Sequence, residues 1–167
     1  STFLPEDRAE GGLTLEAADL DGDGSPELIV GYQRSIAVWT RRSEGRFLQD
    51  SGVRLPTSAA GFQEIRLADV DGDGDLDMIL ATLYSGLRLW IQRGGQNFVD
   101  ETDARLPPGL GLGTVAALEV GDFDGDDAVD LFVSGGGGTH GLLNRGNGAF
   151  REPDGLRLPE PLAVQTD

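Results

Sequence analysis

The sequence contains a nine-residue stretch, from Asp69 to Asp77, in which acidic residues alternate with other residues in a glycine-rich turn. The acids at positions one, three, five and nine are Asp69, Asp71, Asp73 and Asp77. Near-copies begin at Asp19, which is 50 residues earlier, and at Asp122, which is 53 residues later. One structural unit carrying one acidic loop is therefore used three times, and the fold must be built from three equivalent units.

Four carboxylates in so short a loop repel one another unless a cation lies between them. Two like charges about 4 Å apart repel by roughly 4 kcal/mol at an effective dielectric near 20, and four carboxylates form six pairs. Turning them inward without a cation would therefore cost on the order of 10 kcal/mol, comparable to the stability of a whole domain. Alternating oxygen ligands suit Ca²⁺, whereas Mg²⁺ tends to keep its waters and zinc favours His or Cys. The chain has one histidine and no cysteine, so we expect up to three Ca²⁺ ions, one per repeat.

The residues between the acids fit a tight loop. Glycine stands at position four of all three loops and at position six of the first two, where it lets the backbone turn at low steric cost. In the third loop Asp127 replaces that glycine, and aspartate tolerates left-handed backbone better than most residues. Position seven varies, as expected for a residue that offers only its backbone carbonyl. Its occupants are Ser25, Asp75 and Ala128.

Two other interpretations of the loops remain open but are disfavoured. An EF-hand or dockerin loop uses a glutamate at position twelve and flanking helices. Position twelve here is Val30, Leu80 or Val133, within runs typical of strands. Acidic turns on a solvated surface are the second alternative, but they do not account for three copies of one alternating pattern.

Charge and composition restrict the partners and the setting. The net charge is −16, and three Ca²⁺ ions would bring it to −10, which argues against nucleic acid or an anionic membrane as a partner. No apolar run is long enough to span a membrane. The absence of cysteine leaves the redox compartment open. Calcium loops without a bidentate glutamate suit calcium-rich surroundings, so we expect an extracytoplasmic setting: secreted, periplasmic or at the cell surface.

The pattern of apolar residues predicts an all-β fold with four short strands in each repeat. The repeats span approximately residues 13–56, 62–107 and 115–159 of a single segment, 1–167, and residues 1–12 could hold a strand of a preceding unit. In the third repeat, the glycine run at residues 135–138 predicts a longer and softer loop. No segment shows a helical period. Four strands in a repeat of this length are the signature of a propeller blade.

The repeats resemble FG-GAP/VCBS repeats, the calcium-loop blades of integrin α-subunit propellers and of many secreted bacterial proteins. The matching segments are Asp19–Gly24, Ala68–Asp77, Gly121–Asp126 and Asn147–Phe150. The resemblance implies a β-propeller with Ca²⁺ in the loop between the first two strands of each blade. It implies side-chain ligands at Asp19, Asp21, Asp23, Glu27, Asp69, Asp71, Asp73, Asp77, Asp122, Asp124, Asp126 and Asp130, and carbonyl ligands at Ser25, Asp75 and Ala128. Glu27 departs from the usual aspartate at position nine.

Three blades do not close a ring, since propellers have four to eight. An open arc would expose apolar faces at its two ends, and such faces need a partner. The sequence therefore predicts one of three arrangements. The chain belongs to a longer propeller, or a second copy completes the ring, or the arc docks on a different protein.

Other conspicuous residues receive ordinary structural interpretations. His140 is the single histidine, so a catalytic triad would have to use it, but it is expected in a loop. Residues 136–141 match a dinucleotide-binding G-x-G-x-x-G by spacing, yet no helical pattern follows. Trp39 and Trp90 recur at the same place in their repeats, which favours packing in the core or between blades over stacking on a sugar.

We therefore expect a non-enzymatic, calcium-stabilised propeller module that serves as a protein-interaction or adhesion scaffold. The first alternative is a carbohydrate-binding module, since some propellers of the resembling family look like lectins. The second is the non-catalytic part of a polysaccharide-active enzyme whose active residues lie outside this segment.

Overall fold

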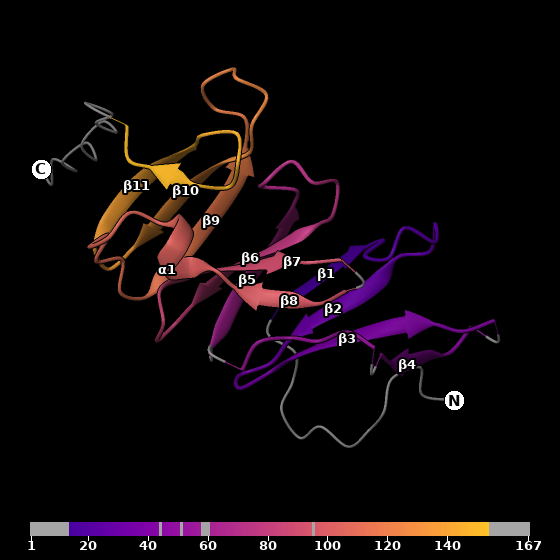
Figure 1. The fold of residues 1–167 in the computed structure, drawn as a ribbon. Helices are drawn as coiled ribbons and strands as arrows, with labels where there is room; N and C mark the ends of the chain where they lie inside the picture. The colour runs from indigo at the N-terminus through magenta and orange to yellow at the C-terminus, as the bar shows by residue number, and fades with distance from the viewer. Residues whose placement is uncertain (1–13, 44, 51, 58–60, 95, 154–167) are drawn as a thin grey trace, which may run out of the picture.

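The computed structural model describes residues 14–43, 45–50, 52–57, 61–94 and 96–153. These residues form three β-sheets and one short helix (Figure 1). Two sequence expectations lie outside the described residues: a strand within residues 1–12 and the final part of the third repeat after residue 153. Within the described residues, no helix has the length and apolarity that a membrane span requires.

Each sheet contains four antiparallel strands that pair in the order of the chain. The first sheet contains β1 (Thr14–Ala18), β2 (Glu27–Gly31), β3 (Ile36–Arg41) and β4 (Phe47–Gln49). The second contains β5 (Phe62–Ala68), β6 (Asp77–Thr82), β7 (Leu87–Gln92) and β8 (Phe98–Asp100). The third contains β9 (Val115–Gly121), β10 (Asp130–Gly135), β11 (Gly138–Asn144) and β12 (Phe150–Arg151). The all-β prediction with four strands per repeat is confirmed.

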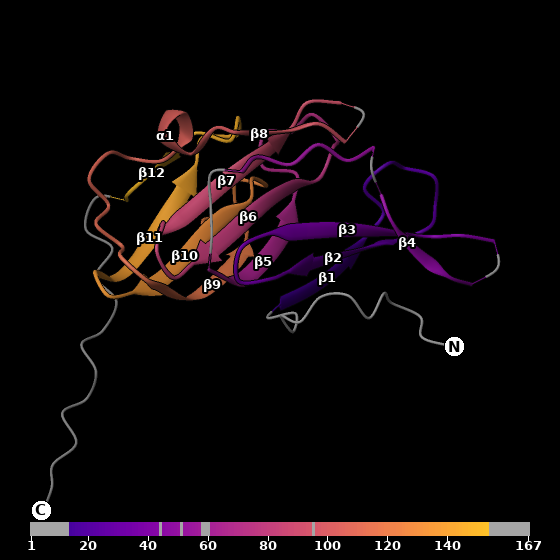
Figure 2. The same ribbon diagram turned by 90° about the horizontal axis from the view of Figure 1, so that it is seen from below.

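The three sheets pack face to face, with their first strands next to one another. β5 contacts β1 on one side and β9 on the other. Figure 2 shows these three strands along one edge of the molecule. The three acidic loops follow directly from β1, β5 and β9, so they occupy equivalent places in the three sheets.

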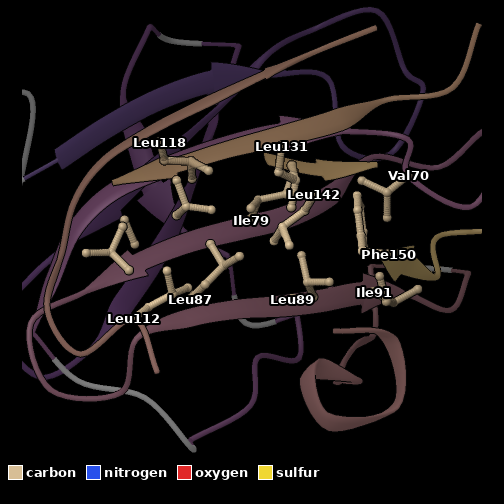
Figure 3. Close-up of a cluster of buried hydrophobic side chains, with 13 residues drawn as sticks. Val70, Ile79, Leu87, Leu89, Ile91, Leu112, Leu118, Leu131, Leu142 and Phe150 are labelled. Atoms are coloured by element: carbon tan, nitrogen blue, oxygen red, sulfur yellow. The ribbon is translucent and has the colours of Figure 1, made fainter. Parts of the chain in front are cut away.

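Two apolar cores fill the space between neighbouring sheets. β6 contributes to both, because successive side chains of a strand point to opposite faces. Met78 and Leu80 belong to the core against the first sheet, whereas Ile79 and Ala81 belong to the core against the third sheet (Figure 3). All residues of β6 are buried, which explains why this part of the sequence is a continuous apolar run rather than an alternating pattern.

Trp39 and Trp90 occupy the same place in the first two sheets, opposite Leu28 and Met78. Trp90 is 1% exposed and packs edge-on against Phe62, with ring centroids 6.0 Å apart. Trp39 is 4% exposed and belongs to a third apolar cluster on the other face of the first sheet. The expectation that both tryptophans serve in packing is confirmed, because neither ring is free to stack on a sugar.

The segments that follow the first two sheets pack on the next sheet. Arg54 forms a parallel bridge with Asn97, and Leu55 packs against the core between the first and second sheets. After the second sheet, the helical turn α1 (Thr102–Arg105) leads to Leu106, which packs against the core between the second and third sheets. No helix was expected from the sequence, because four residues are too few to show a helical period.

The prediction of a long, soft loop at the glycine run of the third repeat is wrong. Gly135 ends β10, Gly138 begins β11, and the two residues pair across a short turn. The run is rich in glycine because two backbones approach closely: a Cβ at Gly135 would lie 2.2 Å from the carbonyl oxygen of Thr114. His140 consequently lies in β11, paired with Val133, and not in a loop.

Candidate metal centres

The three acidic loops join the first and second strands of the sheets, at residues 19–26, 69–76 and 122–129. In each loop the first aspartate accepts hydrogen bonds from three backbone N–H groups. Asp69 Oδ1 accepts from Gly72 and Asp73 at 2.8 and 3.2 Å, and Asp69 Oδ2 accepts from Gly74 at 2.9 Å. The equivalent bonds recur in the first and third loops. The three loops therefore share one local structure.

Left-handed backbone at position six lets each loop close over its first aspartate. The φ angles there are 87° at Gly24, 92° at Gly74 and 67° at Asp127. The structure thus confirms that Asp127 adopts the conformation of the glycines that it replaces. A side chain in this region of backbone space is strained, but aspartate bears the strain better than most residues.

The acid at position nine is the first residue of the second strand in each sheet, and it is buried. Glu27, Asp77 and Asp130 are at most 1% exposed. Each accepts a hydrogen bond from the backbone N–H at position two of its own loop, at 3.0, 3.0 and 2.9 Å respectively. The buried carboxylate therefore fixes the loop to the strand that follows it.

The structure brings the acids at positions one, three and nine together. In each loop these three residues offer carboxylate oxygens that lie within 4.8 Å of one another. The acid at position five lies outside these groups and accepts the N–H of position seven instead, at 2.7 to 2.9 Å. The three groups are Asp19, Asp21 and Glu27; Asp69, Asp71 and Asp77; and Asp122, Asp124 and Asp130. Each group could hold a metal ion.

Two carboxylate oxygens in these groups are buried and have no hydrogen-bond partner. They are Glu27 Oε1 and Asp71 Oδ1. Glu27 is 1% exposed, and the side chain of Asp71 is 9% exposed. An unpartnered buried polar atom is costly. A cation within the first or the second group would satisfy the unpartnered oxygen of that group, so these residues fit a metal ion.

Burial and mutual repulsion shift the acidities within the groups. Burial, with added repulsion from Asp71 and Asp73, raises the pKa of Asp77 to about 6. Burial also raises the pKa of Glu27. Backbone N–H groups, chiefly that of Gly125, lower the pKa of Asp122. The innermost carboxylates of the first two loops therefore resist ionisation unless positive charge is nearby.

The second loop contacts two arginines that the sequence analysis did not identify. Asp71 Oδ2 accepts hydrogen bonds from Arg93 at 3.1 Å and from Arg105 at 2.8 Å. Arg105 also donates to Glu101 at 2.8 Å and to the carbonyl of Asn147, in the turn between β11 and β12, at 2.8 Å. The sequence signal that could have found Arg105 is the Arg-Leu-Pro run at residues 105–107, which repeats residues 54–56.

His140 pairs with the carboxylate of Glu152, with 2.6 Å between Nδ1 and Oε1. Its other ring nitrogen lies 3.4 Å from the carbonyl of Gly137. No serine hydroxyl hydrogen-bonds this imidazole within the described part of the chain. The G-x-G-x-x-G spacing falls on the turn between β10 and β11 and on β11 itself, where no helix N-terminus is present to bind a phosphate.

An open groove of about 900 Å³ lies at the ends of β1 and β5 that are remote from the acidic loops. Tyr84, in the turn between β6 and β7, lines the groove and is 80% exposed. Its ring rests against Gly61, where a Cβ would come within 2.9 Å of the ring. Arg66 also lines the groove and forms ion pairs with Glu16 and Glu64, which line it too.

The sequence model of the FG-GAP-like repeat matches this chain twice, at residues 19–80 and 69–133. One matching solved structure shows the basis of specific recognition of non-reducing terminal N-acetylglucosamine by a lectin from Agrocybe aegerita. It is 22% identical, with a TM-score of 0.52, and the match covers 81% of this chain and 36% of the lectin chain. The chain thus spans about a third of that lectin, and the likeness concerns the fold alone. Comparison with curated proteins gave no significant match.

Proposed function

This chain belongs to the FG-GAP-like repeat family, and we propose that it is a calcium-stabilised β-propeller segment that serves as an extracytoplasmic scaffold for binding or adhesion to another protein. The observation that carries the calcium proposal is the pair of buried, unpartnered oxygens, Glu27 Oε1 and Asp71 Oδ1. Each belongs to a group of carboxylates that would repel one another without a cation.

Calcium is favoured over other metals by the chemistry of the donors. The groups offer carboxylate oxygens only, and Ca²⁺ accepts six to eight oxygens in flexible geometry. We assign the remaining ligands to the acids at position five and the carbonyls at position seven. The proposed ligand set is Asp19, Asp21, Asp23, Ser25 and Glu27; Asp69, Asp71, Asp73, Asp75 and Asp77; and Asp122, Asp124, Asp126, Ala128 and Asp130.

The propeller proposal rests on the way the sheets are arranged. Three four-stranded sheets pack face to face with their first strands together, as blades do around an axis. At the open end of this array, Phe123 is 47% exposed and packs edge-on against Phe132. We propose that further blades cover this end. They would come from the same longer chain, a second copy or another protein.

The extracytoplasmic setting follows from the proposed ligands. Loops that lack a bidentate glutamate at position twelve resemble extracellular modules, which bind Ca²⁺ at roughly 10⁻⁴ to 10⁻³ M. Such affinities require calcium-rich surroundings. The proposed role of the ion is structural, because it reduces the net negative charge of each loop and fixes the strand that follows it.

The test is the solution mass by light scattering on a size-exclusion column, with excess Ca²⁺ and then with a chelator, together with elemental analysis. We expect bound calcium, and a chain that unfolds or aggregates more readily when calcium is removed. A discrete dimer in calcium would identify a second copy as the source of the missing blades. A folded species that is indifferent to chelator and contains no metal would refute the calcium proposal. Polysaccharide turnover that is lost in His140→Ala would contradict the non-enzymatic scaffold.

The second candidate function is carbohydrate binding, and the observation that favours it is the groove beside Tyr84. An exposed aromatic ring offers an apolar face on which a sugar ring can stack, and amide, carboxylate and guanidinium groups beside it can hydrogen-bond the hydroxyls of the sugar. Gln33 and Gln63 line the same groove. A glycan array with the unmodified chain, Tyr84→Ala and Tyr84→Phe tests it. A sugar signal that survives in Tyr84→Phe and is lost in Tyr84→Ala would favour this function over a pure scaffold.

A further inference from the structure

Two buried amides link the first and the second acidic loop to the sheet that follows each of them. Gln92 ends β7 and Asn144 ends β11, and they are 2% and 3% exposed. Gln92 Nε2 donates to the carbonyl of Leu20 in the first loop, at 3.2 Å. Asn144 Nδ2 donates to the carbonyl of Val70 in the second loop, at 2.8 Å. Both bonds reach position two of the preceding acidic loop.

The same two residues also hold the buried acid of their own sheet. The backbone N–H of Gln92 donates to Asp77 Oδ1 at 2.8 Å, and that of Asn144 donates to Asp130 Oδ1 at 2.7 Å. The other oxygen of Asp77 accepts the N–H of Val70 at 3.0 Å. A continuous buried path therefore runs from the first loop through the second loop to the third.

We propose that this path couples the calcium sites, so that occupancy of one loop raises the affinity of the preceding loop. The proposal rests on the proposed calcium function. The proposed ligand Asp77 accepts the backbone N–H of Gln92, and the proposed ligand Asp130 accepts that of Asn144. When the ion leaves, the carboxylates repel one another and the loop opens, and the amide that holds the preceding loop loses its anchor. By linkage the effect is reciprocal.

The two junctions differ in strength. Asn144 Oδ1 accepts the N–H groups of Gly146 and Gly148, at 3.0 and 2.9 Å, whereas Gln92 Oε1 is buried without a partner. Arg105 adds a second link across the same junction as Asn144, from Asp71 to the carbonyl of Asn147. Coupling between the second and third loops should therefore exceed that between the first and second.

The test is an NMR calcium titration of the full chain, in which the amides of Gly24 and Gly74 report the first and second loops separately. Asp69→Asn removes the ion from the second loop, and Gln92→Met cuts the path while keeping the backbone N–H and the side-chain length. We expect Asp69→Asn to weaken calcium binding at the first loop by about fivefold or more, the usual lower range of coupling between sites. In the Gln92→Met background, Asp69→Asn should change the calcium affinity of the first loop by less than about twofold. Asp122→Asn should weaken calcium binding at the second loop by a larger factor than Asp69→Asn weakens it at the first loop.

If the calcium affinity of the first loop is unchanged by Asp69→Asn, the coupling is overturned and the calcium function is left intact. A full effect that persists in Gln92→Met would overturn the assigned path. Absence of calcium from every loop of the unmodified chain would overturn both proposals. Thermal melting of Gln92→Met in calcium checks that the variant still unfolds cooperatively.

Discussion

Arg105 donates a hydrogen bond of 2.8 Å to Asp71, and this bond joins α1 to the second acidic loop. Arg105 is largely buried, with 11% of its side chain exposed, whereas Arg93, the other partner of Asp71, is 39% exposed. Removing one partner of a buried ion pair leaves an uncompensated charge, whereas an exposed pair contributes little to stability. The two arginines should therefore differ in their effect on folding.

Arg105→Met should lower the free energy of unfolding by about 3 kcal/mol in the presence of a chelator. The control Arg93→Met should lower it by no more than about 1 kcal/mol. Urea unfolding followed by circular dichroism measures both. Calcium should reduce the loss in Arg105→Met, because the ion neutralises Asp71 in place of the guanidinium. Equal losses in the two variants would contradict the role assigned to Arg105.

Gly148→Ala should destabilise the chain more than Gly146→Ala. Both glycines have left-handed backbone, with φ of 73° and 77°, and a side chain there costs about 1 kcal/mol. A Cβ at Gly148 would also lie 1.9 Å from Arg105 Nη1, whereas one at Gly146 would meet nothing within 4 Å. The Cβ at Gly148 would lie 3.0 Å from Asp71 Cβ as well, so the difference in unfolding free energy between the variants measures the crowding by both residues. A difference near zero would show that Arg105 moves aside freely.

Chelation of calcium should lower the midpoint of thermal unfolding by about 15 °C or more. Each site held at 100 times its dissociation constant contributes about 2.7 kcal/mol, so three such sites contribute about 8 kcal/mol together. Each kcal/mol moves the midpoint of a chain of this size by about 2–4 °C. Calcium added back should restore the midpoint, and Mg²⁺ at the same concentration should not. The triple variant Asp19→Asn, Asp69→Asn, Asp122→Asn is the control and should respond to neither ion.

Without calcium, the contribution of Asp77 to stability should decrease as the pH rises. Its pKa is raised from 3.8 to about 6 in the folded chain, so between these values the folded chain holds a proton that the unfolded chain has lost. The free energy of unfolding therefore falls across this window, by about 3 kcal/mol in total, and levels off above it. Urea unfolding in chelator between pH 4 and 7 should show a flatter profile for Asp77→Asn. With calcium the trend reverses, because the ion needs the ionised carboxylate.

Trp90→Ala should lower the free energy of unfolding by about 3–5 kcal/mol, because it opens a cavity in the core between the first two sheets. Tyr84→Ala is the matched control at an exposed aromatic position and should change it by less than about 0.5 kcal/mol. Denaturant unfolding in calcium measures both. A large loss of unfolding free energy in Tyr84→Ala would show that the ring contributes to packing despite its 80% exposure.

The strands and acidic loops were predictable because their signals are local and repeat three times. Alternating acids define a loop within nine residues, and the buried acid at position nine marks the start of the next strand. The hairpin at Gly135–Gly138 was not predictable from local pattern. Its glycines are required because the backbone of residues 111–114 approaches them closely, and the packing of the third sheet brings that segment near.

The links between loops could not be derived from the sequence for a related reason. Gln92 and Asn144 reach carbonyls 72 and 74 residues earlier in the chain. A polar residue at the end of an apolar strand was the available signal, but the first repeat carries Arg41 there, which obscures the pattern. Arg105 likewise contacts residues that are distant in sequence and are brought together by the adjacent sheets.

The burial of β6 on both faces has a consequence for how its pairing is chosen during folding. A shift of one residue would exchange Met78 and Leu80 with Ile79 and Ala81, replacing apolar side chains with apolar side chains in both cores. The hydrophobic pattern normally selects the register of a strand, but here it barely distinguishes one register from the next. Asp77 supplies the missing discrimination, because its carboxylate meets two N–H groups in one alignment only. An acid of a proposed metal site thus also disfavours misaligned pairing of its strand.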